Sequence, residues 1–164
     1  MKIQMAVGLA VAAVAIIAAA PGDDTPQFSP NDWLLSVPDP DDRARLLQKQ
    51  MRGFDQPMLE VGERYRSFKE ALGRGNYDLA AYQWRKIRVT IENGIEKRPG
   101  RAENARQVFL DATWDEVRTG VESSDPVKAV AAYELANSSC QACHVAEQVD
   151  YVNAQVLFET PPFK

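Results

Sequence analysis

The sequence predicts an all-α fold: an antiparallel four-helix bundle preceded by an N-terminal export segment and a proline-rich linker. Apolar residues recur every three or four positions through four long stretches of the 164-residue chain, which is the period of amphipathic helices. Glycine, proline and helix-capping residues separate these stretches by short connections, which favour antiparallel neighbours. No stretch alternates as a half-buried strand does, and the sequence contains no internal repeat or low-complexity tract.

Residues 1–20 have the pattern of a secretory signal peptide. Lys2 supplies a positive start, an uninterrupted apolar run extends from Met5 to Ala20, and the run ends in the small residues of a cleavage site. We therefore expect an exported, periplasmic protein. Pro21 is an unfavourable residue directly after a cleavage site, so an uncleaved segment that anchors the protein in a membrane stays open as the alternative.

Residues 21–40 form the predicted linker, and residues 41–164 the predicted helical domain. The linker is defined by its prolines, which are Pro21, Pro26, Pro30, Pro38 and Pro40. The first helical pattern starts near Asp41 and continues through Leu46, Leu47, Gln50 and Phe54. Asp55 followed by Pro57 then indicates a new helix N-terminus or a kink.

The next helix is expected to end at Gly73-Arg74-Gly75-Asn76. Its apolar face consists of Met58, Val61, Gly62, Tyr65, Phe68 and Leu72. The glycines can adopt the left-handed conformation that ends a helix, and Asn76 can cap the helix that follows. This tetrapeptide therefore predicts a tight corner. The second long helix runs from Tyr77 to Pro99-Gly100, with an inner face of Ala80, Trp84, Ile87, Ile91 and Ile95.

Two further helices complete the predicted bundle. One spans roughly Arg101 to Gly120, with an inner face of Ala105, Val108, Phe109, Ala112 and Val117. The last begins with Ser124 or Asp125 as cap and Pro126 in its first turn, where a missing N–H costs nothing. Its inner face follows Val130, Tyr133 and Ala136 to Cys140, Cys143 and His144.

The charge pattern excludes several function classes. The formal net charge is -4 and the isoelectric point is near 5.1, so the basic surface that nucleic-acid binding requires is missing. Local basic clusters, the larger of which spans residues 85–101, are interpreted as solvated helix faces, with docking of a redox partner as the alternative. Neighbouring acids such as Asp115 and Glu116 are interpreted as capping or solvated residues, so no enzyme is predicted.

Both cysteines and the single histidine of the chain lie within Cys140-Gln141-Ala142-Cys143-His144. C-x-x-C-H is the attachment pattern of c-type haem, in which two thiols bond to the haem vinyl groups and the imidazole ligates iron. A thioredoxin-like dithiol would need a βαβ unit, and a zinc site would need a fourth ligand. The motif therefore predicts one covalent haem c, bound by Cys140 and Cys143, with His144 as the proximal iron ligand.

The second axial ligand is less determined by the sequence. No second histidine exists, and no methionine follows His144. Met51 and Met58 are the methionines outside the export segment, and an antiparallel bundle can return either to a haem on the last helix. We favour Met58, since Gly62 lies one turn away on the same face and lets a flat ligand approach the backbone. Core packing by Met58, with an open distal site, is the alternative.

The helix order with C-x-x-C-H near the C-terminus resembles the class II c-type cytochromes, the cytochrome c prime superfamily of four-helix bundles. More narrowly, several segments look like a group of exported bacterial haem-binding cytochromes; they are residues 51–55, 58–65, 75–77, 82–87 and 98–99. The resemblance covers roughly Arg43 to Tyr151. It implies thioether bonds at Cys140 and Cys143, a proximal His144, and a distal side that is either open or occupied by Met58. The basic residue common soon after the family histidine is missing, as Val145-Ala146-Glu147 stands there.

These features predict a periplasmic electron carrier. A haem with Met and His ligands favours the ferrous state, which suits single-electron transfer between redox partner proteins. One alternative is a five-coordinate haem module that binds nitric oxide or carbon monoxide, and another is a bound electron-delivering subunit of a larger complex. A homodimer through helix contacts stays open, and a membrane association follows only if the N-terminal segment is uncleaved.

Overall fold

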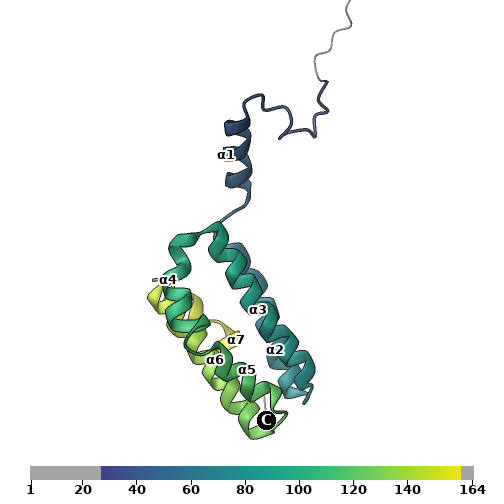
Figure 1. Ribbon diagram of the computed structural model, residues 1–164. Helices are drawn as coiled ribbons and strands as arrows, with labels where there is room; N and C mark the ends of the chain where they lie inside the picture. The colour runs from purple at the N-terminus through teal and green to yellow at the C-terminus, as the bar shows by residue number, and fades with distance from the viewer. Residues whose placement is uncertain (1–26, 160–164) are drawn as a thin grey trace, which may run out of the picture.

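The computed structural model describes residues 27–159, and every regular element in this range is helical. The prediction of an all-α fold is confirmed. In Figure 1 the longer helices lie lengthwise against one another, and the first helix extends away from one end of them. The expected export segment, residues 1–20, lies outside the described residues. Within residues 27–159, no helix is long and apolar enough to cross a membrane.

Helix α1, Pro40–Gln50, begins at an Asp39 cap and buries none of its residues. The Asp39 carboxylate accepts hydrogen bonds from the backbone N–H groups of Asp41 and Asp42, at 2.8 and 2.9 Å. The first helical pattern was expected to continue to Phe54, but the helix ends four residues earlier. Arg52, with a φ of 58°, turns the chain, and a new helix begins at Asp55.

Helices α2, Asp55–Gly73, and α3, Tyr77–Lys97, form an antiparallel pair. Gly75 ends α2 in the left-handed conformation, with a φ of 67°, and the Asn76 side chain accepts from the Leu79 N–H at 3.1 Å. The predicted corner is confirmed. At the other end of the pair the helices approach closely, because a Cβ on Gly94 would lie 2.9 Å from the Phe54 ring.

The prediction of a single helix over residues 101–120 is wrong. The chain instead forms a 3-10 turn, η1 (Pro99–Arg101), one turn of α4 (Ala102–Asn104), a π-helical segment η2 (Ala105–Leu110), and then α5 (Trp114–Glu122) after a three-residue turn. The apolar residues explain the break. Within η2, Ala105 and Leu110 are both buried at a spacing of five positions, which is the repeat of a π turn and not of an α-helix. Ala112, expected on the inner face, is exposed as a result.

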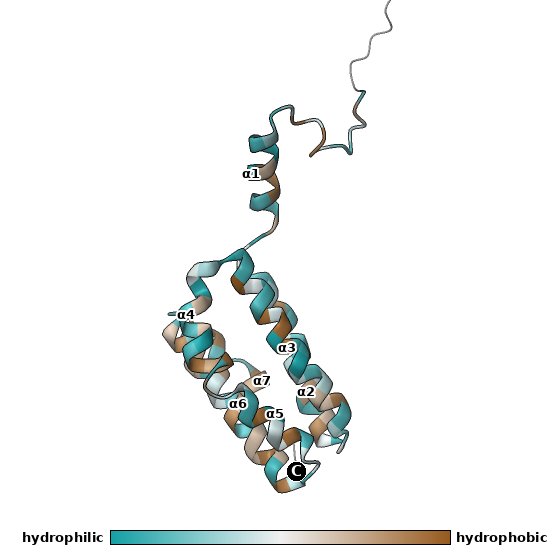
Figure 2. Ribbon diagram, viewed as in Figure 1, coloured by the Kyte–Doolittle hydropathy of each residue, from teal (hydrophilic) through white to brown (hydrophobic). Residues whose placement is uncertain are grey.

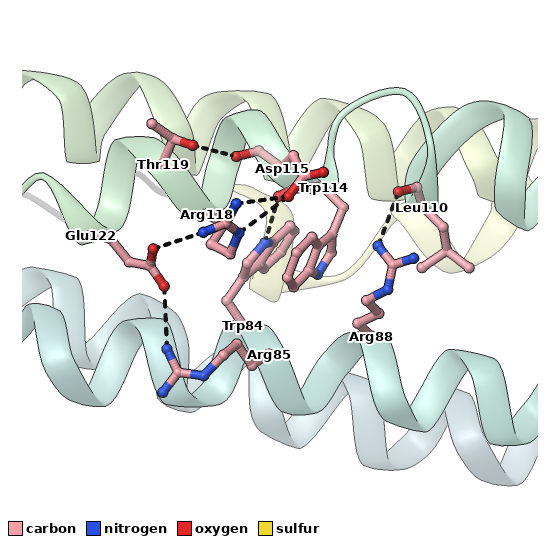
Figure 3. Close-up of polar contacts among 9 residues, drawn as sticks. All are labelled: Trp84, Arg85, Arg88, Leu110, Trp114, Asp115, Arg118, Thr119 and Glu122. Atoms are coloured by element: carbon pink, nitrogen blue, oxygen red, sulfur yellow. Dashed lines mark hydrogen bonds and ion pairs between the residues drawn. The ribbon is translucent and has the colours of Figure 1, made fainter.

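Polar and aromatic contacts join α3 to α5 (Figure 3). The buried Trp84 indole N–H donates to the backbone carbonyl of Trp114 at 3.0 Å. The Arg88 and Arg118 guanidinium groups lie over the Trp114 ring, 4.8 and 5.7 Å from its centroid. Arg88 also donates to the Leu110 carbonyl at 3.3 Å, so it stabilises the irregular turn before α5.

Helix α6, Pro126–Ala146, runs antiparallel to the whole 101–122 segment. Its Asp125 cap accepts from the Val127 N–H at 2.8 Å, as the sequence predicts. Near its start, a Cβ on Gly120 of α5 would lie 2.8 Å from the Ala132 Cβ. At its end, the Asn104 side chain donates to the Ala146 carbonyl at 3.2 Å. Contacts at both ends hold α6 in register with α4 and α5.

The core between these helices is rich in aromatic side chains. Along α2 and α3 in Figure 2, apolar residues alternate with hydrophilic ones. The largest fully buried rings come from α2, α3 and α6, and they are Tyr65, Phe68, Trp84 and Tyr133. Phe68 lies 5.3 Å from Trp84 and 6.5 Å from Tyr133 between ring centroids, so this cluster connects three helices.

Candidate functional site

The five-residue cysteine and histidine motif occupies the last two turns of α6. Because helical residues three and four apart share a face, the Cys140, Cys143 and His144 side chains are brought together on one side of the helix. All three are partly buried, and Cys140 packs against the core cluster. The arrangement places two sulfur atoms and an imidazole at the border between core and solvent.

Both thiols are in surroundings that keep them protonated. Burial raises the pKa of the Cys140 thiol to about 12, and the neighbouring Cys143 adds to the rise. Burial also raises the pKa of Cys143, with a further contribution from Glu147. Neither cysteine forms a disulfide. A dithiol that works by thiolate attack needs a lowered pKa, so these surroundings do not favour thiol–disulfide exchange.

The His144 ring is held by a residue that the sequence analysis did not single out. His144 Nδ1 lies 2.6 Å from the Asn153 Oδ1 atom, and the Asn153 Nδ2 group donates to the Gln141 carbonyl at 3.2 Å. The Phe158 ring lies edge-on to the imidazole, with centroids 5.8 Å apart. Asn153 belongs to a short 3-10 helix, η3 (Asp150–Asn153), and Phe158 to α7 (Val156–Glu159).

A tight reversal after α6 brings Asn153 back to His144. The Val149 N–H donates to the His144 carbonyl at 2.9 Å, and the Gln148 N–H donates to the Val145 carbonyl at 3.0 Å. This pair of bonds is the Schellman arrangement that ends many helices, and it requires a left-handed residue. Gln148 takes that position with a φ of 60°, where glycine is usual.

Tyr65 of α2 faces this end of α6 with an unpaired hydroxyl group. The residue is 2% exposed, and its Oη atom makes no hydrogen bond of full geometry, although the Tyr133 side chain lies close to it. Its ring lies 5.8 Å from Tyr133 and 6.0 Å from Phe158 between centroids. Burial raises the pKa of Tyr65, and Cys140 and Tyr133 are near enough to raise it further. A buried donor without an acceptor, beside a motif cysteine, suits a group that is bound from outside the chain.

The contacts of Tyr65 also define how α2 is aligned with α6. Tyr65 lies near both Tyr133 and Cys140, whereas Phe68, further along α2, contacts Tyr133. The two helices therefore run antiparallel. Met58 lies seven residues before Tyr65 on α2. In an antiparallel pair this step corresponds to moving from Cys140 toward the C-terminal end of α6. Met58 is partly buried and packs against the core cluster.

The other predicted positions on the distal side differ from one another. Met51 is 44% exposed and lies at the C-cap of α1, away from the core. Gly62 lies on α2 between Met58 and Tyr65, and a Cβ built on it would meet nothing within 4 Å. This part of α2 therefore has space beside its backbone. Met58 lies on α2 and His144 on α6, and Met58 as an iron ligand stays a prediction.

The charged residues near the motif are mostly paired with one another. Glu147 pairs with Arg101 and accepts from the Asn104 side chain at 3.0 Å. Asp115, considered above as a surface acid, pairs with Arg118 at 3.0 Å, which supports its interpretation as a surface residue. Among residues 27–159, no three His, Cys, Asp or Glu side chains converge as a metal cluster.

The residues present fit a haem attached at this motif. Two thiols and an imidazole share one helix face, the unpaired Tyr65 hydroxyl lies beside Cys140, and space remains next to Gly62. Phe158 also lies here, in contact distance of both His144 and Tyr65.

Comparison with known proteins found no matching family model, no matching curated protein and no matching solved structure.

Proposed function

We propose that this chain is an exported c-type cytochrome that carries one haem c and transfers single electrons between periplasmic redox partners. Cys140 and Cys143 hold the haem through thioether bonds, and His144 is the proximal iron ligand. The observation that carries the proposal is the placement of the only two cysteines and the only histidine on one face of α6, at the edge of an aromatic core.

The haem, once bound, supplies the one-electron chemistry; the chain supplies its surroundings. Cys140 and Cys143 fix the position of the macrocycle on α6. The aromatic residues Tyr65, Tyr133 and Phe158 lie near the motif and would exclude water from a haem bound there, which would lower the local dielectric and favour the less charged ferrous state. Arg101 pairs with Glu147 next to the motif, so that acid would add little negative charge near a bound haem.

The proposal includes a four-helix bundle of the cytochrome c prime type. Its four members are α2, α3, the interrupted 101–122 segment, and α6 with the haem motif near its end. Antiparallel contacts between consecutive members support this arrangement, as does the antiparallel alignment of α2 with α6. Helix α1 has no place in the bundle, because none of its residues is buried.

Met58 is the proposed distal ligand. The antiparallel alignment leads from Tyr65, which lies near Cys140, back along α2 to Met58 at the level of the C-terminal part of α6. The open space beside Gly62, on the same helix, is where a flat macrocycle can approach the backbone. A thioether and an imidazole together raise the reduction potential, which suits an electron carrier.

Binding of nitric oxide or carbon monoxide on a five-coordinate iron is the second candidate function. The unpaired Tyr65 hydroxyl favours it, since a single buried donor in apolar surroundings can stabilise a bound diatomic ligand. This function needs an open distal position, so it excludes Met58 coordination. The spin state of the ferric protein separates the two candidates.

Covalent pigment in the matured protein tests the proposal. We expect the full-length chain, produced in a host with a cytochrome assembly system, to keep its haem through acid–acetone extraction. Cys140→Ala with Cys143→Ala should abolish covalent attachment, whereas Ser138→Ala, an exposed change on the same helix, should leave it intact. A colourless wild-type protein, or pigment that extracts from it, would refute the function.

A further inference from the structure

The Asn153 side chain bridges two parts of the haem motif. Its carbonyl oxygen lies 2.6 Å from His144 Nδ1, and its amide nitrogen donates to the backbone carbonyl of Gln141 at 3.2 Å. Asn153 belongs to η3, whereas His144 and Gln141 belong to the last turns of α6. Asn153 lies nine residues after His144 in the chain. Both His144 and Asn153 are partly buried, so water has limited access to the hydrogen bond between them.

The contact with Gln141 determines which atom of the amide faces the imidazole. If the Asn153 amide were reversed, its oxygen would face the Gln141 carbonyl oxygen, and two acceptors would repel each other. The nitrogen therefore faces Gln141, and the oxygen faces His144. An amide oxygen only accepts hydrogen bonds, so the His144 Nδ1 atom must carry the proton.

We infer that Asn153 is a positioning residue for His144, which holds the ring in the tautomer with Nδ1 protonated and Nε2 available as the ligating nitrogen. Its meaning for iron rests on the proposed function. A neutral imidazole in solution can carry its proton on either nitrogen. Only the form with the proton on Nδ1 leaves the lone pair of Nε2 free to bind a metal. Fixing the form and the ring orientation before ligation reduces the cost of binding.

The local structure holds Asn153 independently of the imidazole. The Schellman reversal at Gln148 directs the chain back along α6, and the Val152 N–H donates to the Val149 carbonyl at 3.0 Å within η3. Nearby, the Asn137 side chain donates to the Phe158 carbonyl at 3.2 Å, which attaches α7 to α6. The acceptor is therefore presented to His144 by backbone contacts, and it does not depend on a flexible side chain alone.

The strength of this acceptor should adjust the reduction potential of a bound haem. A stronger acceptor makes the imidazole more electron-rich, which favours the ferric state and lowers the potential. Asn153→Asp places a charged acceptor at nearly the same size, so the midpoint potential should fall. Asn153→Leu removes the acceptor, so the potential should rise and the Nδ1 proton should exchange rapidly with water.

The test measures midpoint potential and the imidazole nitrogen spectrum in the full-length holoprotein. His144 is the only histidine, so its ¹⁵N-labelled imidazole signals need no further assignment. We expect a slowly exchanging Nδ1 proton in the wild type that is lost in Asn153→Leu, and opposite shifts of potential for the Asp and Leu variants. Ser138→Ala, which removes an exposed side-chain hydrogen bond to the Leu135 carbonyl elsewhere on α6, should change neither quantity.

The outcomes separate this inference from the proposed function. If the protein carries haem and both Asn153 variants keep the wild-type potential and Nδ1 proton, the inference is wrong and the function stands. If the protein carries no haem, the function is wrong, and the tautomer is then measured in the haem-free full-length chain. A predominantly Nε2-protonated His144 in that chain would also overturn the inference.

Discussion

The Tyr65 and Tyr133 rings lie nearly parallel across the core, with centroids 5.8 Å apart and 12° between their planes, and the Tyr65 hydroxyl makes no hydrogen bond of full geometry. A buried polar group of this kind costs free energy, on the order of 1–3 kcal/mol, when nothing accepts its proton. The cost is acceptable where the group gains a partner in the working state. Tyr65 therefore offers a way to compare the haem-free and haem-bound chain.

Tyr65→Phe should have opposite effects on stability in the two forms. In the haem-free chain it removes an unpaired hydroxyl, so the free energy of unfolding should rise by about 1 kcal/mol. In the holoprotein the hydroxyl is expected to have found a partner at the haem, so the gain should vanish or become a loss. Chemical denaturation of both forms measures the difference.

Tyr82→Phe is the matched control, because its side chain is 45% exposed and its hydroxyl can be hydrated in either form. It should be nearly neutral throughout. An equal stabilisation by Tyr65→Phe with and without haem would show that the hydroxyl stays unpaired, and that its place beside Cys140 has no bearing on the bound group.

Gln148→Gly should stabilise the protein by about 1 kcal/mol. Gln148 has a φ of 60° at the end of α6, where a side chain is strained and glycine is not. Gly75 occupies the equivalent position at the end of α2 with a φ of 67°, so Gly75→Gln is the reverse experiment and should destabilise by a similar amount. Thermal unfolding of the two variants measures both changes.

Gln148→Gly can also be checked through the contact between Asn153 and His144. Asn153 follows the reversal at Gln148. If Gln148→Gly made this reversal more mobile and loosened η3, the His144 Nδ1 proton would exchange faster with water. We expect the exchange rate to stay unchanged, since the two Schellman hydrogen bonds remain in place. A destabilised Gln148→Gly variant would contradict the strain argument.

Gly120→Ala should destabilise the protein by about 1–3 kcal/mol, since the added methyl group has no room. Its Cβ would lie 2.8 Å from the Ala132 Cβ and 3.1 Å from the Lys128 carbonyl oxygen, and the latter belongs to backbone that cannot easily move. Gly100→Ala is the control, because a Cβ there meets nothing within 4 Å. Denaturant midpoints that are equal for the two variants would argue against the close packing of α5 on α6.

Much of the helix pattern was predictable because it depends on local chemistry. The corner before α3 follows from Gly75 and Asn76, and the start of α6 follows from Asp125 with Pro126, whose effects act within a few residues. The interruption of the 101–122 segment was not predicted, although its signal is present. Ala105 and Leu110 are both apolar and buried at a spacing of five, which an α-helix does not place on one face.

The candidate site divides in the same way. Cys140, Cys143 and His144 could be recognised because their spacing alone defines the motif. Asn153 could not, since its contact with His144 depends on the left-handed turn at Gln148, a residue type that seldom takes this conformation. The unpaired Tyr65 hydroxyl was also invisible in the sequence, because an apolar stripe does not reveal which of its polar atoms find partners.

Met58→Leu should convert the protein from a low-spin to a high-spin iron. The wild-type ferric spectrum is expected to show the charge-transfer band of a thioether ligand, and a leucine of similar volume removes the sulfur at a cost below about 1.5 kcal/mol in stability. The variant should then bind carbon monoxide readily in the ferrous state. Absorption spectra of the oxidised and reduced protein measure both effects.

Met51→Leu is the matched control, because Met51 is 44% exposed at the end of α1 and should leave every band unchanged. If the thioether band persisted in Met58→Leu and disappeared in Met51→Leu, the distal ligand would be Met51. That result would overturn the alignment of α2 with α6. A wild-type protein that is already high-spin, with Met58→Leu indistinguishable from it, would exclude Met58 from the iron. The gas-binding function would then replace electron transfer, since an open distal position is what a diatomic ligand requires.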